Sequence, residues 1–150
     1  MARVDDENPV IGAITLPGAE LSVACARRFV RDLLGAGHPS LDDVELCVSE
    51  AVTNSVQHTA SGRGGKVTVR LRAEADSIVT EVTDDGAGGA RPHLRADPAG
   101  LGGRGMRIIE AVTLAWGLRP DGDRTTVWMR FPGPIPSPPR SEKPRYPQLM

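Results

Sequence analysis

Residues 46–58 read LCVSEAVTNSVQH and combine a helical repeat with an unusual row of polar side chains. Glu50, Asn54 and His58 recur every four residues, so on a helix they lie along one face. The apolar residues around them supply the surface of a buried helix; they are Leu46, Cys47, Val48, Ala51, Val52 and Val56. A carboxylate, a carboxamide and an imidazole in one row on such a helix are either solvated or face a ligand. The rest of the sequence favours a ligand.

The segments around this helix predict a mixture of helices and strands. Ser40 is a suitable N-cap for the polar helix, which is expected to end near Thr59. After it, the apolar period changes from helical to alternating, as in half-buried strands. The predicted elements are strands at 10–16, 67–72 and 78–83, helices at 19–34 and 104–112, and a hairpin of strands 114–119 and 125–131. The glycine-rich stretch 85–103 predicts a long loop, and such loops are usually functional or disordered.

The length of 150 residues allows one domain with one core. We expect a flexible N-terminus at 1–9, a globular domain at 10–131 and a disordered, proline-rich tail at 132–150. The tail holds seven of the 13 prolines. An inert tail is the favoured interpretation, and binding to a proline-reading domain is the alternative.

The composition, 39% hydrophobic and 25% charged, is that of an ordinary soluble protein. A net charge of −1 creates no global field that would attract nucleic acid or acidic lipid, so neither is an expected partner. The sequence shows neither a signal-peptide pattern nor an apolar run of membrane-spanning length, and the expected location is the cytoplasm. Cys25 and Cys47 form no Cys-x-x-Cys pair and are predicted to be small buried hydrophobes. No zinc site is expected.

The second motif is VTDDGAG at residues 82–88, which follows an apolar strand. The carboxylate of Asp84 can accept a hydrogen bond from a ligand amine there. Gly86 and Gly88 let the backbone approach a flat ring closely. Taken alone, this motif is better interpreted as a plain turn.

The third motif is GLGGRGM at residues 100–106, and a helix follows it at once. Glycines that open a helix leave its free N–H groups facing outward, where they can bind phosphate. Arg104 adds a forked cation suited to a terminal phosphoryl group. The alternative, a flexible linker, does not explain why a helix begins immediately afterwards.

The order of the three motifs resembles the N box and two glycine boxes of the GHKL ATPase superfamily, which includes gyrase, MutL and the histidine kinases. Residues 48–58 are most similar to the small anti-sigma-factor serine/threonine kinases of bacterial sporulation and stress pathways. The resemblance covers roughly residues 10–131. It implies an α/β two-layer sandwich, with a mixed, mainly antiparallel sheet, helices on one face, and ATP between helices and lid.

The resemblance also implies a role for each motif residue. Asn54 would hold Mg²⁺ through its side-chain oxygen, and Glu50 would be the general base that takes the proton of an attacking hydroxyl. Asp84 would bind the adenine amino group, in a pocket shaped by Gly86 and Gly88.

The glycine-rich helix start would hold the other end of the nucleotide. The residues implied to cradle the phosphates are Gly103, Arg104, Gly105 and Met106, with Arg104 near the γ-phosphate. Residues 89–102 would form the ATP lid, and Thr126 would lie near the adenine. His58 matches a position that is often basic in the small kinases, and a surface or capping role is equally open.

The function implied by the resemblance is that of an ATP-dependent serine/threonine kinase and anti-sigma factor. Such a protein binds a sigma factor and phosphorylates a STAS-type anti-anti-sigma partner, often as a homodimer. The alternative is a non-catalytic ATP-binding regulatory module that controls its partner through lid conformation. The intact Glu50 favours the kinase, and a simple ATPase is a third option.

Overall fold

The structure is a computed structural model that describes residues 9–86 and 103–136. Its elements, in chain order, are β1 (Val10–Pro17), α2 (Leu21–Leu34), α3 (Leu41–His58), the 3-10 turn η1 (Ala60–Arg63), β2 (Lys66–Glu74), β3 (Ser77–Asp84), α4 (Gly103–Val112), β4 (Ala115–Asp121) and β5 (Arg124–Pro132). Each predicted helix and strand is present, with ends that differ by one or two residues. The turn η1 was not predicted.

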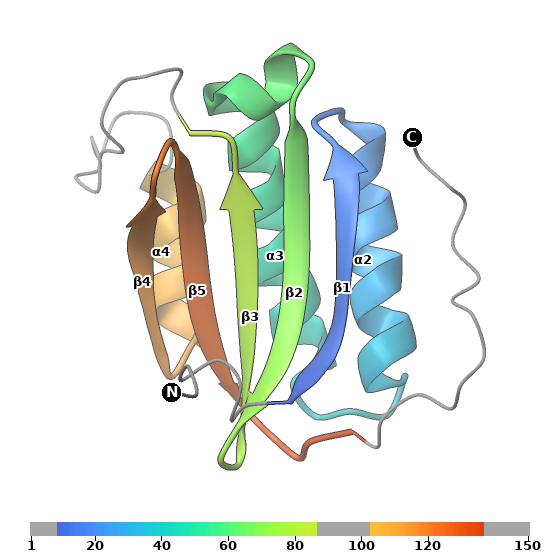
Figure 1. Cartoon of the computed structure of the whole chain (residues 1–150). Helices are drawn as coiled ribbons and strands as arrows, with labels where there is room; N and C mark the ends of the chain where they lie inside the picture. Colours follow the sequence, from blue (N-terminus) through green and yellow to red (C-terminus); the bar gives the residue numbers. More distant parts are fainter. Residues whose placement is uncertain (1–8, 87–102, 137–150) are drawn as a thin grey trace, which may run out of the picture.

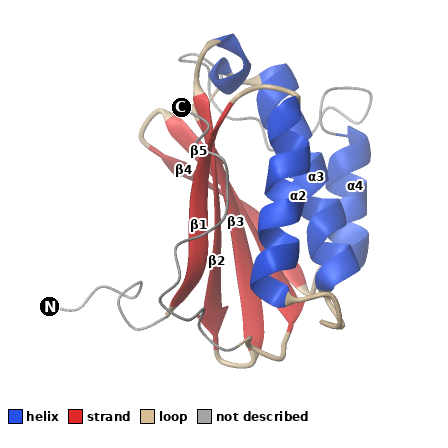
Figure 2. Ribbon diagram, turned by 90° about the vertical axis from the view of Figure 1, so that its right-hand side faces the viewer, coloured by secondary structure: helices blue, strands red, loops and turns tan. Residues whose placement is uncertain are grey.

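The strands form one sheet in the order β1-β2-β3-β5-β4. All four pairings between these strands are antiparallel, whereas a mixed sheet was expected. Helices α2, α3 and α4 cover one face of the sheet, and no helix of the described residues covers the other (Figures 1 and 2). The predicted two-layer α/β sandwich is therefore confirmed.

The core lies between the sheet and the three helices. Alternate residues of each strand point to opposite faces, and those on the helix side are almost all apolar and buried. Val67, Val69 and Leu71 of β2 are fully buried, as are Val48 and Val52 of α3. Burial of each such side chain contributes about 1.5–3 kcal/mol, so this interface holds the two layers together. It also fixes which side of α3 turns away from the core.

Residues 133–135, which follow β5, lie against the domain. The Ser40 hydroxyl donates a 2.7 Å hydrogen bond to the carbonyl of Pro132. His38 Nε2 lies 2.7 Å from the carbonyl oxygen of Pro134, while His38 Nδ1 is 3.0 Å from the backbone nitrogen of Ser40. One neutral tautomer of His38 satisfies both contacts. Ile135 packs, half-buried, against the core.

Two expectations about this region need correction. The tail was expected to begin at residue 132, but Pro132 is the last residue of β5 and residues 133–135 contact the domain. Ser40 does precede α3, yet its side chain makes no capping hydrogen bond, because the hydroxyl is used on Pro132. Residues 137–150 lie outside the described residues, and their disorder stays a prediction.

The two cysteines differ in their surroundings. Cys47 is fully buried in α3, and Cys25 is half-buried against the core. Burial, followed by the negative charges of Asp43 and Glu50, raises the pKa of the Cys47 thiol to about 12. Cys47 is therefore an unreactive core residue at neutral pH. Within the described ranges, no helix is long and apolar enough to cross a membrane.

Candidate functional site

The predicted polar row lies on α3, and its members Glu50, Asn54 and His58 are each half-buried. The side-chain nitrogen of Asn54 is buried, yet it has no hydrogen-bond partner among the described residues. Leaving a buried amide donor unpaired costs about 1–3 kcal/mol. Such an atom is typical of a site that is completed by a ligand. His58 lies in the last turn of α3, where a positive charge is favourable.

The first turn of α4 lies directly against this row. A Cβ added to Gly105 would be 3.0 Å from Asn54 Nδ2 and 3.5 Å from Glu50 Oε1. Glycine at this position therefore lets the α4 backbone approach both polar side chains. The first four N–H groups of a helix have no partner within the helix, and its N-terminus favours anions. The structure thus brings together a carboxylate, an amide and a helix N-terminus.

Asp84 lies at the end of β3 on the helix side of the sheet and is only 8% exposed. Its Oδ1 accepts a 2.7 Å hydrogen bond from the backbone N–H of Gly86. The Ser55 hydroxyl is 3.4 Å from Asp84 Oδ2, but it also lies 2.9 Å from the carbonyl oxygen of Ala51. A hydroxyl has a single proton to donate, so Ser55 cannot satisfy both acceptors fully. Among the described residues, no basic side chain pairs with Asp84.

The environment of Asp84 disfavours its charged form. Burial is the main cause that raises the pKa of this carboxyl group, and the nearby charge of Asp85 adds to it. The hydrogen bonds from Gly86 and Ser55 act in the opposite direction. Within the part of the chain that the structure describes, Asp84 therefore keeps unused hydrogen-bonding capacity at a buried position, which is typical of a ligand-binding carboxylate.

Ser55 was not predicted as a site residue. It follows Asn54 on α3 but points to the sheet, where it is 3% exposed. The sequence signal was a serine at a position of α3 where the helical pattern predicts a buried apolar side chain. Because Ser55 and Asn54 are neighbours on α3, the Asp84 end and the α4 end of the site are joined by one helix.

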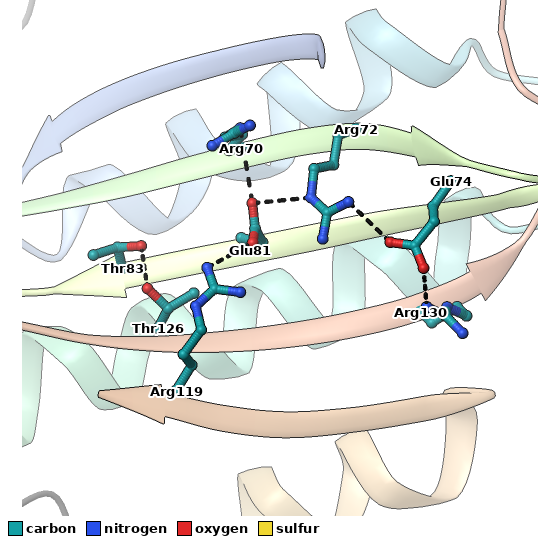
Figure 3. Close-up of polar contacts among 8 residues, drawn as sticks. All are labelled: Arg70, Arg72, Glu74, Glu81, Thr83, Arg119, Thr126 and Arg130. Carbon is teal, nitrogen blue, oxygen red and sulfur yellow. Dashed lines mark hydrogen bonds and ion pairs between the residues drawn. The ribbon is translucent and has the colours of Figure 1, made fainter. Parts of the chain in front are cut away.

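Thr126 lies on the wrong face for its expected role near the adenine. Its hydroxyl is 2.7 Å from that of Thr83, on the sheet face opposite to Asp84 (Figure 3). The cross-strand partner of Asp84 is Thr125, which is 7% exposed. Directly paired residues of antiparallel strands share a face. Thr125, not Thr126, is therefore the β5 residue beside Asp84.

The remaining predicted residues are placed only in part. Gly86 has a φ of +77°, and a Cβ there would overlap the carbonyl oxygen of Asp123, so the turn requires glycine. Met106 packs, half-buried, against the core. Gly88 and the lid at residues 89–102 lie outside the described residues. Gly103 and Arg104 open α4, and the role of the Arg104 side chain stays a prediction.

The outer face of the sheet carries a second polar cluster, built around Glu81. This carboxylate is 4% exposed and lies 2.9 Å from Arg119, 3.4 Å from Arg72 and 3.7 Å from Arg70 (Figure 3). Arg72 also pairs with Glu74. The charges in this cluster lie close to opposite charges, which indicates a structural role, although the buried Nε atoms of Arg70 and Arg72 have no hydrogen-bond partner among the described residues.

Comparison with known proteins identifies the family of the domain. The family model of the histidine kinase-like ATPase domain matches residues 16–131, most of the chain. The chain belongs to this family. Membership confirms the predicted superfamily and fold, and it implies that the domain binds ATP.

Three curated relatives show which members of the superfamily the chain is similar to. The anti-sigma F factor of Clostridium acetobutylicum is 44% identical over 48 residues, 32% of this chain and 34% of the relative. The serine-protein kinase RsbW of Listeria innocua is 36% identical over 53 residues, 35% of this chain and 34% of the relative. RsbW of Bacillus licheniformis is 29% identical over 92 residues, 53% of this chain and 57% of the relative. The chain thus spans between a third and just over half of these relatives' lengths.

Proposed function

We propose that this protein is an ATP-dependent serine/threonine kinase that acts as an anti-sigma factor. The observation that carries the proposal is the position of Glu50 and Asn54, one helical turn apart on α3 and both against the first turn of α4. The names of the relatives, an anti-sigma factor and serine-protein kinases, support the same function. We further propose that the protein acts in the cytoplasm, binds neither nucleic acid nor membrane, and forms a homodimer.

The adenine end of the nucleotide is assigned to Asp84. Its buried carboxylate has acceptor capacity left over, and the exocyclic amine of adenine is a donor. Guanine carries an oxygen at the equivalent position, and two acceptors facing each other repel. The site should therefore select ATP over GTP. Thr125 and Ser55 add hydroxyl groups on the same side of the sheet.

The phosphate end is assigned to the start of α4 and to Asn54. The free N–H groups of the α4 first turn suit phosphate oxygens, and Gly105 leaves room at that point. The amide of Asn54 offers a neutral hard oxygen of the kind that Mg²⁺ binds, and its nitrogen has no hydrogen-bond partner in the described part of the chain. Bound Mg²⁺ would supply neutralisation of the phosphate charge.

Glu50 is assigned the role of general base. In the transfer, the serine oxygen of the partner bonds to the γ-phosphorus, the bond from that phosphorus to the ADP oxygen breaks, and the hydroxyl proton passes to the Glu50 carboxylate. Phosphoryl transfer depends mainly on in-line positioning and charge neutralisation, and a positioned base contributes roughly 10²- to 10⁴-fold. Arg104 is assigned to the γ-phosphate.

The partner proposed to receive the phosphoryl group is a STAS-type anti-anti-sigma protein, with a sigma factor bound in the alternative state. Single-turnover transfer from γ-labelled ATP to a STAS-domain partner tests this directly. Wild type should label the partner, and Glu50→Ala should lower the rate roughly 10²- to 10⁴-fold with little change in ATP affinity. ATP binding without transfer to any partner would instead support a non-catalytic regulatory module.

A further inference from the structure

Asp85 follows the proposed adenine-binding residue but has no part in the proposed chemistry. It lies just beyond β3, where the paired ladder between β2 and β3 has ended. At that point Asp85 Oδ2 accepts a 2.7 Å hydrogen bond from the backbone N–H of Lys66. A side-chain acceptor thus extends the connection between the two strands past the end of the ladder.

The other side of the same segment contacts β5 and the turn before it. Arg124 Nε lies 3.9 Å from Asp85 Oδ1, although the Arg124 side chain is 63% exposed and the pair is correspondingly weak. The backbone of Gly86 is so close to the carbonyl oxygen of Asp123 that no Cβ would fit. Residues 85–86 are therefore held between β2 on one side and the β4–β5 turn on the other.

We infer that Asp85 is a positioning residue that holds Asp84 in its nucleotide-binding orientation. The connection runs through the backbone, because the N–H of Gly86 donates to Asp84 Oδ1 at 2.7 Å. Gly86 in turn follows the residue that is tied to Lys66. Without that tie, the segment gains conformational freedom that nucleotide binding must then remove, and affinity falls. This inference rests on the proposed function, since it assigns a task to the same site.

Two substitutions separate the hydrogen bond of Asp85 from its charge. Asp85→Asn keeps an oxygen that can accept from the Lys66 N–H, but it removes the negative charge beside Asp84. Asp85→Ala removes both. If the tie to β2 is what matters, asparagine should restore the behaviour that alanine loses.

The experiment is titration calorimetry of the full chain with ATP·Mg²⁺. Asp85→Ala should bind about 10-fold more weakly than wild type, which corresponds to about 1.4 kcal/mol. Asp85→Asn should recover most of this loss, because its side-chain oxygen can still accept from the Lys66 N–H, although a neutral acceptor binds less strongly than a carboxylate. Asp32→Ala, at an exposed position of α2, is the matched control and should bind like wild type.

Hydrogen exchange of the Gly86 amide without nucleotide gives a second readout, independent of ATP. Asp85→Ala should speed this exchange while the core amides of β2 and β3 keep their protection, and Asp85→Asn should not. Wild-type ATP affinity in Asp85→Ala would overturn the inference and leave the proposed function intact. Equal loss in the alanine and asparagine variants would also overturn it. If wild type bound no ATP, the proposed function would fail. In that case the exchange measurement would still test the inference, because unchanged Gly86 exchange in Asp85→Ala would reject the role of the hydrogen bond between Asp85 and Lys66.

Discussion

Two carboxylates on β3, Glu81 and Asp84, are both almost completely buried but lie on opposite faces of the sheet. Glu81 has three arginines around it, and its two oxygens are shared among them. Asp84 has one backbone N–H and a hydroxyl that also contacts another acceptor. Among the described residues, the same functional group is thus surrounded by cations on one face and left with spare hydrogen-bonding capacity on the other.

This difference indicates which face binds a ligand. A buried charge surrounded by partners has already exchanged its hydration for protein contacts, so a further ligand would have to break them. A buried carboxylate with few partners gains from a new donor. The helix side of the sheet, and not the arginine-rich outer face, is therefore where a nucleotide should bind, and substitutions on the two faces should have opposite signatures.

The largest expected effect is on the outer face. Glu81→Gln removes the buried counter-charge of Arg72, whose side chain is only 10% exposed, and leaves Arg72 paired with the half-buried Glu74. Breaking a buried pair in this way costs on the order of 3 kcal/mol, reduced here because Arg70 and Arg119 can turn to water. Urea denaturation should show this loss while ATP affinity stays unchanged. Asp32→Asn, at an exposed position of α2, is the control and should cost less than about 0.5 kcal/mol.

A smaller effect separates the two adjacent threonines of β5. Thr125→Val removes a hydroxyl beside Asp84, whereas Thr126→Val removes one that pairs with Thr83 on the outer face. A neutral hydrogen bond contributes about 0.5–1.5 kcal/mol, so Thr125→Val should lower ATP affinity roughly 3- to 10-fold. Thr126→Val should leave it unchanged. The reverse pattern in a nucleotide titration would mean that the face assigned to each residue is wrong.

The smallest effect concerns stability as a function of pH. The pKa of Asp84 is raised in the folded state, mainly by burial, so folded Asp84 holds its proton to a higher pH than unfolded Asp84. Above the ordinary pKa of 3.8, the folded state then binds more protons than the unfolded state. The free energy of unfolding therefore falls as pH rises from this ordinary pKa through the raised pKa of the folded state. Asp84→Asn removes this component, so without nucleotide the variant should be at least as stable as wild type at pH 7.

Chemical unfolding at several pH values between 3.5 and 7, chosen around that window, checks the direction of the effect. The stability difference between Asp84→Asn and wild type should grow in favour of the variant as pH rises. A variant that loses stability at pH 7, as Glu81→Gln should, would show that Asp84 is a structural carboxylate and that the two faces do not differ in the proposed way.

The sequence predicted the features of the site that depend on local spacing. Glu50 and Asn54 share a face of α3 because residues four apart on a helix are neighbours whatever surrounds them. The α4 helix and the Asp84 turn were likewise visible in short motifs. Their assembly into one superfamily fold is confirmed by the family match.

The errors concern contacts between distant segments. Thr126 was taken from the family resemblance, although Val127, Met129 and Phe131 alternate along β5 and place Thr125 on the core side. The register against β3 then shows that Thr125 lies beside Asp84. The contact between His38 and Pro134 joins residues 96 positions apart, and a proline-rich composition does not predict it. Ser55 was missed because its role depends on the position of Asp84, which lies on a different element.

The central claim is that Asp84 is a nucleotide-binding carboxylate, and titration calorimetry of wild type and Asp84→Asn with ATP·Mg²⁺ and GTP·Mg²⁺ tests it most directly. Wild type should bind ATP and discriminate against GTP. Asp84→Asn should bind ATP on the order of 10- to 100-fold more weakly and lose much of the discrimination, because the acceptor for the adenine amine is replaced by a group that can also donate. Wild-type ATP affinity in a folded Asp84→Asn protein would contradict the account.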